Sequence, residues 1–331
     1  MKSTKATARA HPNIALVKYW GKRDSERILP YQSNFSLTLA PLEVTTTVEL
    51  GAGATSVELN GKEAVGQERA RVVALVEAVG REAGRALGPV RVVSRGNFPM
   101  AAGLASSAAG FAALARATRA AAGLPDDVRA TSRLARTGSG SASRSVQGGF
   151  CTWHRGSRPD GEDSFATQDF TEAHWPELRL LACVVSSLVK DVSSRDGMRS
   201  TVETSPYYPA WVKDAEAEVP RAREAVRKRD LASLGALAER NAWRMHATAL
   251  AADPPLCYLR PATLAVLLEL PRARAKGCPV FFTLDAGPNP VLLTTLEHVA
   301  RVEALAREAG ASDVVRCAPG GDACLLPEPL F

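Results

Sequence analysis

The chain has 331 residues, of which 46% are hydrophobic and 23% are charged, and its formal net charge at pH 7 is +6. It is long enough for a sizeable core in one large domain or two smaller ones, and no run of about 18 apolar residues suggests a membrane span. The basic residues are scattered rather than gathered in blocks, so the charge fits an anionic metabolite at least as well as nucleic acid.

The N-terminal segment and the cysteines favour a cytoplasmic protein. Met1–Ala10 is polar and cationic and no apolar stretch follows it, which predicts that no signal peptide is present. The six cysteines form no Cys-x-x-Cys pair and lack zinc-ligand spacing with histidine. We expect them to be reduced and mostly buried.

The first predicted element is a strand that runs into a cationic corner. Within His11–Trp20, the residues Ile14, Leu16 and Val17 are typical of a strand. Lys18-Tyr-Trp-Gly-Lys-Arg23 follows, and its glycine lets the backbone approach a ligand. Such a cluster of cations suits a diphosphate group. The alternative is a strand end whose lysines bury their alkyl stems and keep their charges in water.

Strands and a helix come next. Ser33–Leu39 and Val44–Leu50 read as strands, and Ser56–Leu59 is expected to return antiparallel to the latter and to close on the hairpin signal Asn60-Gly61. Apolar spacing predicts a helix over Glu68–Leu87. A cation in its first turn, Arg69, opposes the helix dipole. Arg69 therefore either binds a ligand or lies on the surface.

The centre of the sequence is a loop of glycine, alanine and serine. Val90–Val93 predicts a strand, Asn97–Gly110 the loop, and Phe111–Ala121 an alanine-rich helix. Open backbone N–H groups and a helix N-terminus can hold phosphate without a metal. The alternative is a tight turn of small residues packed under the helix. No Walker-type Gly-x-x-x-x-Gly-Lys-Ser/Thr is present, which argues against a P-loop nucleotide fold.

A second segment of small polar residues follows a helix predicted over Asp126–Arg136. Gly138–Ser145 reads Gly-Ser-Gly-Ser-Ala-Ser-Arg-Ser. Its hydroxyls and amides beside one guanidinium suit a carboxylate or a phosphate, although such segments are often flexible linkers. The polar stretch Arg155–Pro176 is expected to be a surface excursion.

The remaining elements are a strand over Leu178–Leu188, a turn and capped helix beginning at Lys190–Met198, helices within Pro209–Ala251 with a cap at Asp230, and a helix over Leu259–Arg274. His246 is expected to pack within its helix rather than act as a base. Val280–Leu284 reads as a strand that feeds Asp285-Ala-Gly-Pro, and on the residues alone Asp285 is a turn former. A helix over Glu297–Gly310 and a glycine-rich turn over Ala318–Cys324 complete the chain.

Five of these segments, in this order, resemble motifs of the diphosphomevalonate decarboxylase family within the GHMP small-molecule kinase superfamily. They are Asn13–Arg23, Pro99–Gly110, Gly138–Ser145, Val192–Met198 and Thr283–Asn289. The resemblance extends from Ala10 to Leu326, and one departure is Ser143, where the family usually has cysteine. One such motif alone would be weak evidence for the family, whereas five motifs in the expected order are strong evidence.

The resemblance implies an α/β (α+β) GHMP-kinase-like fold. Residues 1–190 are expected to form an N-terminal domain like ribosomal S5 domain 2, which binds nucleotide, and residues 191–331 a C-terminal ferredoxin-like domain. The implied reaction phosphorylates the 3-hydroxyl of (R)-5-diphosphomevalonate with ATP and then expels phosphate and CO2, giving isopentenyl diphosphate for isoprenoid biosynthesis. ATP and Mg2+ are the implied cofactors, with magnesium ligands unassigned. A cytoplasmic homodimer without nucleic-acid or membrane partners is expected.

The same resemblance assigns roles to individual residues. Asp285 accepts or orients the hydroxyl proton, Lys18 keeps Asp285 ionised, and Arg144 with Ser139 and Ser141 orients the substrate carboxylate. The residues implied in substrate binding are Tyr19, Trp20, Gly21, Lys22, Arg69, Ser139, Gly140, Ser141, Ala142, Ser143, Arg144, Ser194, Arg195 and Met198. Those implied in ATP binding are Ser94, Asn97, Pro99, Ala101, Ala102, Gly103, Leu104, Ala105, Ser106 and Ser107.

Two other functions fit parts of the sequence. The same scaffold could serve a mevalonate 3-kinase or a phosphomevalonate decarboxylase. A basic nucleic-acid-binding protein is a different class, and steeply salt-dependent retention on DNA would identify it. Dispersed cations and an aromatic content of 6% argue against nucleic acid.

Overall fold

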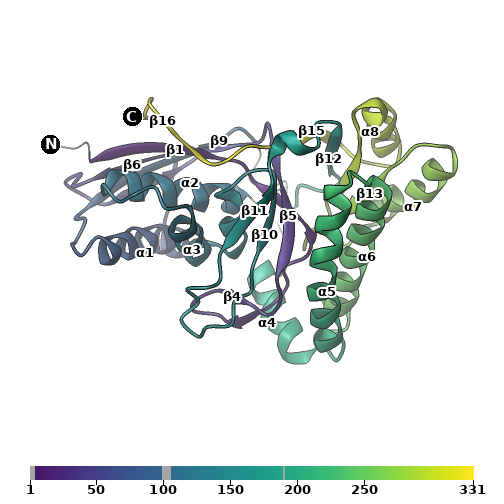
Figure 1. The fold of residues 1–331 in the computed structure, drawn as a ribbon, viewed down its shortest axis with the longest axis horizontal. Coiled ribbons are helices and arrows are strands. Elements are labelled where there is room, and N and C mark those ends of the chain that lie inside the picture. Colours follow the sequence, from purple (N-terminus) through teal and green to yellow (C-terminus); the bar gives the residue numbers. More distant parts are fainter. Residues whose placement is uncertain (1–3, 99–105, 189–190) are drawn as a thin grey trace.

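The computed structural model describes residues 4–98, 106–188 and 191–331, which form a mixed α/β fold around two large sheets. Figure 1 shows one sheet with helices beneath it at one end of the molecule, and a second sheet beside long helices at the other. The six-stranded sheet has the order β16-β1-β6-β9-β7-β8. Its strands are β1 (Lys5–Ala10), β6 (Val44–Leu50), β7 (Ser56–Leu59), β8 (Lys62–Glu63), β9 (Val90–Gly96) and β16 (Cys324–Leu326).

Three helices cover one face of this sheet: α1 (Gly66–Glu82), α2 (Ser106–Ala121) and α3 (Val128–Gly138) (Figure 1). The middle helix is alanine-rich, and Ala112, Ala113 and Ala117 are fully buried. Because alanine side chains are short, α2 packs closely on the strands beneath it. The N-terminus of α2 lies near the start of β6 and the end of β9, since Ser106, Ser107, Val44 and Gly96 line one pocket beside the site described below.

The pairing of β7 corrects one expectation. β7 does not return beside β6: it pairs in parallel with β9, which lies between them in the sheet. The hairpin signal is confirmed one strand later, since Asn60 and Gly61 (φ 50° and 77°) turn β7 into β8. Both strands carry alternating apolar residues, so the pattern showed which face is buried but not which strand is the neighbour.

The second sheet is eight-stranded and joins both halves of the sequence. Its path is β11-β10-β5-β15-β12-β14-β13, with β2 also paired to β5. The strands are β2 (Asn13–Val17), β5 (Asn34–Ala40), β10 (Phe150–Trp153), β11 (Ala166–Phe170), β12 (Leu178–Val184), β13 (Phe281–Thr283), β14 (Val291–Thr295) and β15 (Asp313–Pro319). Apart from Arg179, β12 is apolar because alternate residues face two different cores.

The stretch Arg155–Pro176 is more ordered than a surface excursion. It contains β11, which pairs antiparallel with β10, and the 3-10 helix η3 (Glu172–His174). Its strand is polar on the outer side because it lies at the edge of the sheet. A short hairpin, β3 (Lys22–Asp24) and β4 (Leu29–Pro30), forms a small sheet of its own.

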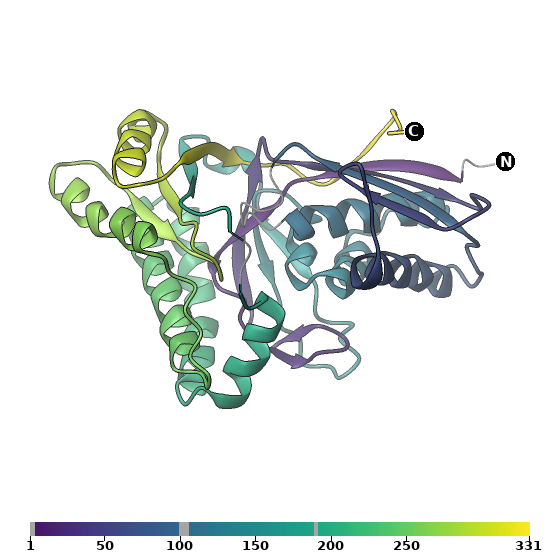
Figure 2. The ribbon, with the colours of Figure 1, turned by 180° about the vertical axis from the view of Figure 1, so that it is seen from behind.

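The predicted helices of the second half of the chain are confirmed. They are α4 (Ser194–Thr204), α5 (Tyr208–Arg227), α6 (Leu231–Leu250), α7 (Pro261–Ala275) and α8 (Val299–Glu308), with a 3-10 turn η4 (Leu296–His298) before α8. The Ser193 side chain caps α4 by accepting from the Asp196 N–H, and Asp230 caps α6 by accepting from the Ser233 N–H. α5 and α6 run side by side along the second sheet (Figure 2).

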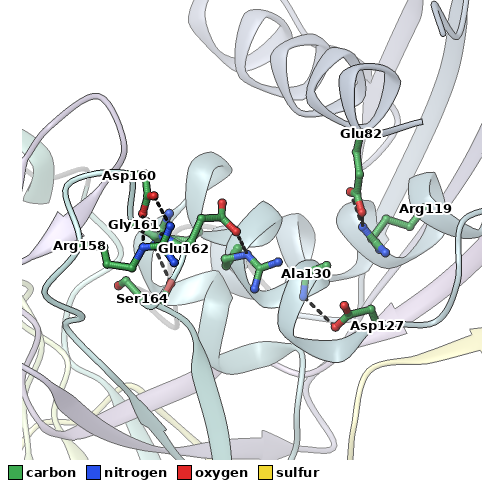
Figure 3. Close-up of polar contacts among 11 residues, drawn as sticks. Glu82, Arg119, Asp127, Ala130, Arg158, Asp160, Gly161, Glu162 and Ser164 are labelled. Carbon is green, nitrogen blue, oxygen red and sulfur yellow. Dashed lines mark hydrogen bonds and ion pairs between the residues drawn. The ribbon is translucent and has the colours of Figure 1, made fainter. Parts of the chain in front are cut away.

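Polar contacts fix α3, the helix that leads into the second small-residue segment (Figure 3). Asp127 caps its N-terminus by accepting from the Ala130 N–H at 3.0 Å. Arg136 donates to the carbonyls of Gly161 and Ser164. An ion pair between Glu82 and Arg119 joins α1 to α2. Gly138–Ser145 is therefore not a flexible linker: it leaves α3 and forms the 3-10 helix η2 (Gly140–Ser145).

The chain passes between the two halves more than once. β12 precedes residue 190 but pairs with β14 and β15, and β16 returns to pair with β1. Both chain ends therefore lie at the same end of the six-stranded sheet (Figures 1 and 2). The division into domains 1–190 and 191–331 stays a prediction.

The cysteines are unpaired and mostly buried, as the sequence predicts. All six are free, four of them are buried, and Cys257 is exposed. None of the helices within the described residues is long and apolar enough to cross a membrane.

Candidate active site

A cleft of about 720 Å³ lies where the end of β2, the N-termini of α1, α2 and α4, the 3-10 helix η2 and the turn after β13 meet. This volume is typical of a small-molecule site. The residues predicted from the sequence that line it are Tyr19, Trp20, Lys22, Ser106, Ser107, Ser139, Gly140, Ser141, Arg144, Ser194, Arg195, Met198 and Asp285. Segments far apart in the sequence thus contribute to one cavity.

An ion pair between a buried lysine and a partly exposed aspartate lies at the cleft. Lys18 follows β2 and Asp285 follows β13, and Lys18 Nζ donates to Asp285 Oδ1 at 2.6 Å. The Lys18 side chain is 1% exposed, whereas that of Asp285 is 37% exposed and faces the cleft. Burial lowers the pKa of Lys18, and the Asp285 carboxylate opposes that change. The pair can therefore hold a proton next to an open cavity.

Arg144 is a buried guanidinium held by two asparagines. Its Nε donates to Asn13 Oδ1 at 3.0 Å and its Nη1 donates to Asn34 Oδ1. Asn13 also donates to Ser141 O and Ser145 Oγ, which ties η2 to β2. Burial lowers the pKa of Arg144 to about 10, so it stays charged at neutral pH. Its Nη2 has no protein acceptor among the described residues, which suits an anionic ligand.

Hydroxyl groups gather beside the N-terminus of α2. Ser139 Oγ lies 3.4 Å from both Ser107 Oγ and Ser141 Oγ. Together with the N–H groups that a helix N-terminus presents, these hydroxyls can bind phosphate or carboxylate oxygens.

Three neighbouring cations line the cleft besides Arg144: Lys22, Arg71 and Arg195. Burial, followed by Arg195 and Arg71, lowers the pKa of Lys22 to about 8. This mutual repulsion is relieved when a polyanion binds, so the trio is suited to a diphosphate.

Arg71 replaces Arg69 in this group. Arg69 is exposed and its Nη2 reaches only Thr55 O at 3.4 Å, outside the cleft. Arg71 lies over the Phe111 ring and donates from Nη2 to Gly138 O at 2.5 Å. Two residues along a helix rotate the side-chain direction by about 200°, to nearly the opposite face of the helix, which the motif alone did not resolve.

Close packing shapes the loop Tyr19–Lys22. Gly21 has φ +102°, and a Cβ there would lie 1.8 Å from the Tyr208 hydroxyl. That hydroxyl donates to Trp20 O at 2.9 Å. A Cβ at Gly140 would come within 2.9 Å of the Tyr19 ring. Only glycine fits either position, and each fixes a residue of the cleft wall.

Several predicted residues do not reach the cleft. Ala142 is in the core, and Ser143 is buried with its Oγ donating to Gly140 O, so both shape η2 from behind. Asn97 is bonded to Pro41 O and the Glu43 N–H. Pro99, Ala101, Ala102, Gly103, Leu104 and Ala105 lie outside the described residues. His246 is 1% exposed, as expected for a packing residue.

A smaller apolar pocket adjoins the cleft. Leu59, Val72, Val92, Phe111 and Leu114 line it. Glu68, Arg71, Ser106 and Ser107 line both spaces. Ser94, predicted to bind nucleotide, lies here and shares a 2.9 Å hydrogen bond with Thr46.

Sequence reasoning missed the residues that hold Arg144. Asn13 and Asn34 are 2% and 0% exposed, and each is the first residue of a buried strand. A buried amide requires a polar partner. An asparagine at the start of a predicted buried strand was therefore the signal for both.

Two family models match most of the chain. One, described as the diphosphomevalonate decarboxylase-like N-terminal domain, matches residues 10–166, and the other, the mevalonate 5-diphosphate decarboxylase C-terminal domain, matches residues 180–315. The diphosphomevalonate decarboxylase of Bos taurus is 41% identical over 91% of this chain and 79% of its own length. The Homo sapiens protein of the same name is 39% identical over 89% of this chain and 78% of its own.

Solved structures agree with the sequence comparison. Mevalonate diphosphate decarboxylase from Staphylococcus aureus has a TM-score of 0.92 at 33% identity, covering 97% of this chain and 98% of its own. A structure described as MDDEF in complex with MVAPP, AMPPCP and magnesium has a TM-score of 0.90 at 39% identity, with the same coverage of 97% and 98%.

Proposed function

The chain belongs to the diphosphomevalonate decarboxylase family, and on that premise we propose that the cleft around Lys18, Asp285 and Arg144 is where it acts. The enzyme catalyses ATP-dependent decarboxylation of (R)-5-diphosphomevalonate to isopentenyl diphosphate, with release of CO2, ADP and phosphate, in the mevalonate pathway. The observation that supports this place most directly is the Lys18–Asp285 pair, which lies in one cavity with three further cations and Arg144.

Different charged groups of the cleft bind different parts of the substrate. Lys22, Arg71 and Arg195 bind the diphosphate, and Arg144 with the Ser139 and Ser141 hydroxyls orients the carboxylate. This leaves the 3-hydroxyl facing Asp285, which takes its proton as the phosphoryl group arrives. The electrons of the bond to CO2 then replace those that depart with phosphate. Phosphate leaves far more readily than hydroxide, which is why phosphorylation comes first.

ATP binds at the opposite wall in this proposal. Ser106, Ser107 and the N-terminus of α2 hold its phosphates. The apolar pocket beside α2 takes the adenine ring, since Val72, Phe111 and Leu114 offer the flat apolar contacts that a base requires.

Magnesium fits the side chains shared by the two spaces. Glu68 and the Ser107 hydroxyl are oxygen donors there, as Mg2+ prefers. Within residues 4–98, 106–188 and 191–331, no group of three or more His, Cys, Asp or Glu side chains could hold a metal. This agrees with an ion held largely by phosphate oxygens and water. When bound, Mg2+ neutralises charge on the phosphates.

Product analysis tests the function. With ATP and the diphosphate we expect ADP, CO2 and isopentenyl diphosphate in equal amounts, and a much lower kcat/KM for mevalonate and its monophosphate because the Lys22, Arg71 and Arg195 charges would lack their partner. Equal kcat/KM for unphosphorylated mevalonate would exclude the diphosphate assignment and favour a 3-kinase.

Arg71 and Arg69 provide a matched pair of variants. We expect Arg71→Met to raise the KM for diphosphomevalonate by roughly 10–10²-fold, because a charged hydrogen bond contributes about 1.5–3 kcal/mol. Arg69→Met should leave it within about twofold, as for an exposed charge. Steady-state kinetics of both variants decide the point, and a larger effect at Arg69 would contradict the assignment.

The lowered pKa of Lys22 predicts a pH dependence. The protonated amine binds diphosphate, so kcat/KM should fall as the pH rises through about 8, where free Lys22 loses its proton. Bound diphosphate raises that pKa, so kcat at saturation should fall only at higher pH. Lys22→Arg should abolish the fall in kcat/KM, and an unchanged profile in that variant would exclude Lys22 as its source.

Assembly as a homodimer and residence in the cytoplasm are the expected context of this activity. Exposed apolar side chains on α6 and α7, including Trp243 (40%) and Leu268 (68%), support a contact between copies. Light scattering after size exclusion would measure the assembly.

A further inference from the structure

Two side chains form hydrogen bonds with the backbone of Lys18, one with its N–H group and one with its carbonyl group. Its N–H donates to Asn241 Oδ1 at 2.7 Å, and its carbonyl accepts from Gln32 Nε2 at 3.1 Å. Asn241 lies on α6, 223 residues away in the sequence, and is 1% exposed. A side chain from the second half of the chain thus sets the position of a residue in the first half.

A buried carboxylate fixes the orientation of Asn241. Its Nδ2 donates to Glu218 Oε2 at 2.6 Å, and Glu218, on α5, is 2% exposed. A carboxylate only accepts hydrogen bonds, so the Asn241 NH2 group must face Glu218. The amide oxygen is then left to face the Lys18 N–H.

The second carboxylate oxygen completes the anchor. Glu218 Oε1 accepts from Arg240 Nε at 2.8 Å and lies 3.5 Å from Arg244 Nη1. Both arginines are 42% exposed, so they neutralise Glu218 from the solvent side while Asn241 binds it from the interior. Separating Glu218 from these partners would leave its charge buried and unpaired, which costs free energy. The arrangement of Glu218, Asn241 and the two arginines is therefore rigid.

The side chain of Lys18 depends on where its peptide lies. Lys18 Nζ donates to Ala15 O at 2.8 Å as well as to Asp285. Ala15 O also accepts from Thr283 Oγ1 at 2.8 Å, at the end of β13 that leads to Asp285. If the Lys18 peptide shifts, the distance between Nζ and the carboxylate changes with it.

We propose that Asn241 and Glu218 are positioning residues for the Lys18–Asp285 pair. Glu218 orients Asn241, Asn241 holds the Lys18 peptide, and Lys18 holds Asp285 toward the substrate hydroxyl. The inference rests on the roles proposed above for Lys18 and Asp285. A contact that only joined α5 to α6 would affect stability alone. The contacts from Glu218 to Asp285 should also affect turnover, because they end on the group that reacts.

The expected consequence is a loss of turnover without a loss of binding. Asn241→Leu keeps the side-chain volume and removes both hydrogen bonds. A displacement of about 1 Å at a catalytic group can cost about 10²-fold in rate, so kcat should fall by about that factor. The KM values for diphosphomevalonate and ATP should stay within about twofold, since Lys22, Arg71 and Arg195 are untouched.

A double variant separates positioning from stability. Asn241→Leu alone leaves Glu218 without its interior partner and should lower the melting temperature. Adding Glu218→Leu removes that buried charge and should restore stability, yet kcat should stay low because the Lys18 N–H is still unheld. Recovery of kcat together with the melting temperature would reduce the contact to a structural one and overturn the proposal.

Two further variants sharpen the test. Glu218→Gln retains an oxygen that can accept from Asn241, so it should recover most of the turnover that Glu218→Leu loses. Arg223→Ala removes an ion pair from α5 to Asp169 of β11 without touching Glu218 or Asn241, and should leave kcat within about twofold.

Wild-type enzyme measured in parallel distinguishes a failure of the proposed function from a failure of the positioning role. Absence of ADP and CO2 from wild type would contradict the proposed function. Normal wild-type turnover matched by Asn241→Leu would contradict the positioning role alone.

Discussion

Replacing Asp285 by asparagine should abolish ADP and CO2 release together, with turnover lower by roughly 10²–10⁴-fold, the usual cost of losing a general base. Asparagine keeps the shape of the side chain but neither accepts the 3-hydroxyl proton nor carries charge. Because phosphorylation precedes CO2 release, both products should disappear in proportion. This separates Asp285 from a residue that acts only in decarboxylation.

The fold should survive this substitution. Asparagine makes the same turns as aspartate, and the local turn is closed by the backbone bond from Gly287 N–H to Asp285 O at 2.7 Å. Lys18 loses its counter-charge, but burial already lowers its pKa, so it can become neutral rather than unfold the site. ADP, CO2 and the melting temperature should be measured on one preparation. A folded Asp285→Asn enzyme within a few-fold of wild type would show that Asp285 is only a turn former.

Arg144→Lys should be nearly as damaging, although it preserves the charge. Asn13 and Asn34 hold the Nε and Nη1 of Arg144, and lysine has no planar fork to match those partners and a carboxylate at once. We expect turnover to fall by about 10²-fold, as for misplaced binding groups. The KM for ATP should change little, because the residues proposed to hold its phosphates lie on α2.

Arg136 is the matched control for this variant. It is also a buried arginine, 4% exposed, but it donates to the Gly161 and Ser164 carbonyls away from the cleft. Arg136→Lys should lower the melting temperature with kcat nearly unchanged. CO2 release by Arg144→Lys at a near-normal rate would remove Arg144 from the mechanism.

Local structure could be predicted from the sequence where a conformation depends only on residues within one short segment. The capped helix after Lys190, the cap at Asp230, the turn at Asn60-Gly61 and the alternating strand Val44–Leu50 are confirmed because each depends on residues a few positions apart. The motifs also named most of the side chains that line the cleft, since those residue types are the ones that bind polyanions.

Contacts between distant segments were decided only by the tertiary structure. β9 lies between β6 and β7, Arg71 rather than Arg69 faces the cleft, and the Lys18 N–H donates to Asn241, 223 positions away. Alternation and helical spacing specify which face of an element is buried, but not which element covers it. By its local sequence alone Asp285 is a turn former, and only the family resemblance implied a catalytic role for it. The tertiary structure adds the physical reason, because it sets the Asp285 carboxylate against a buried lysine at an open cavity.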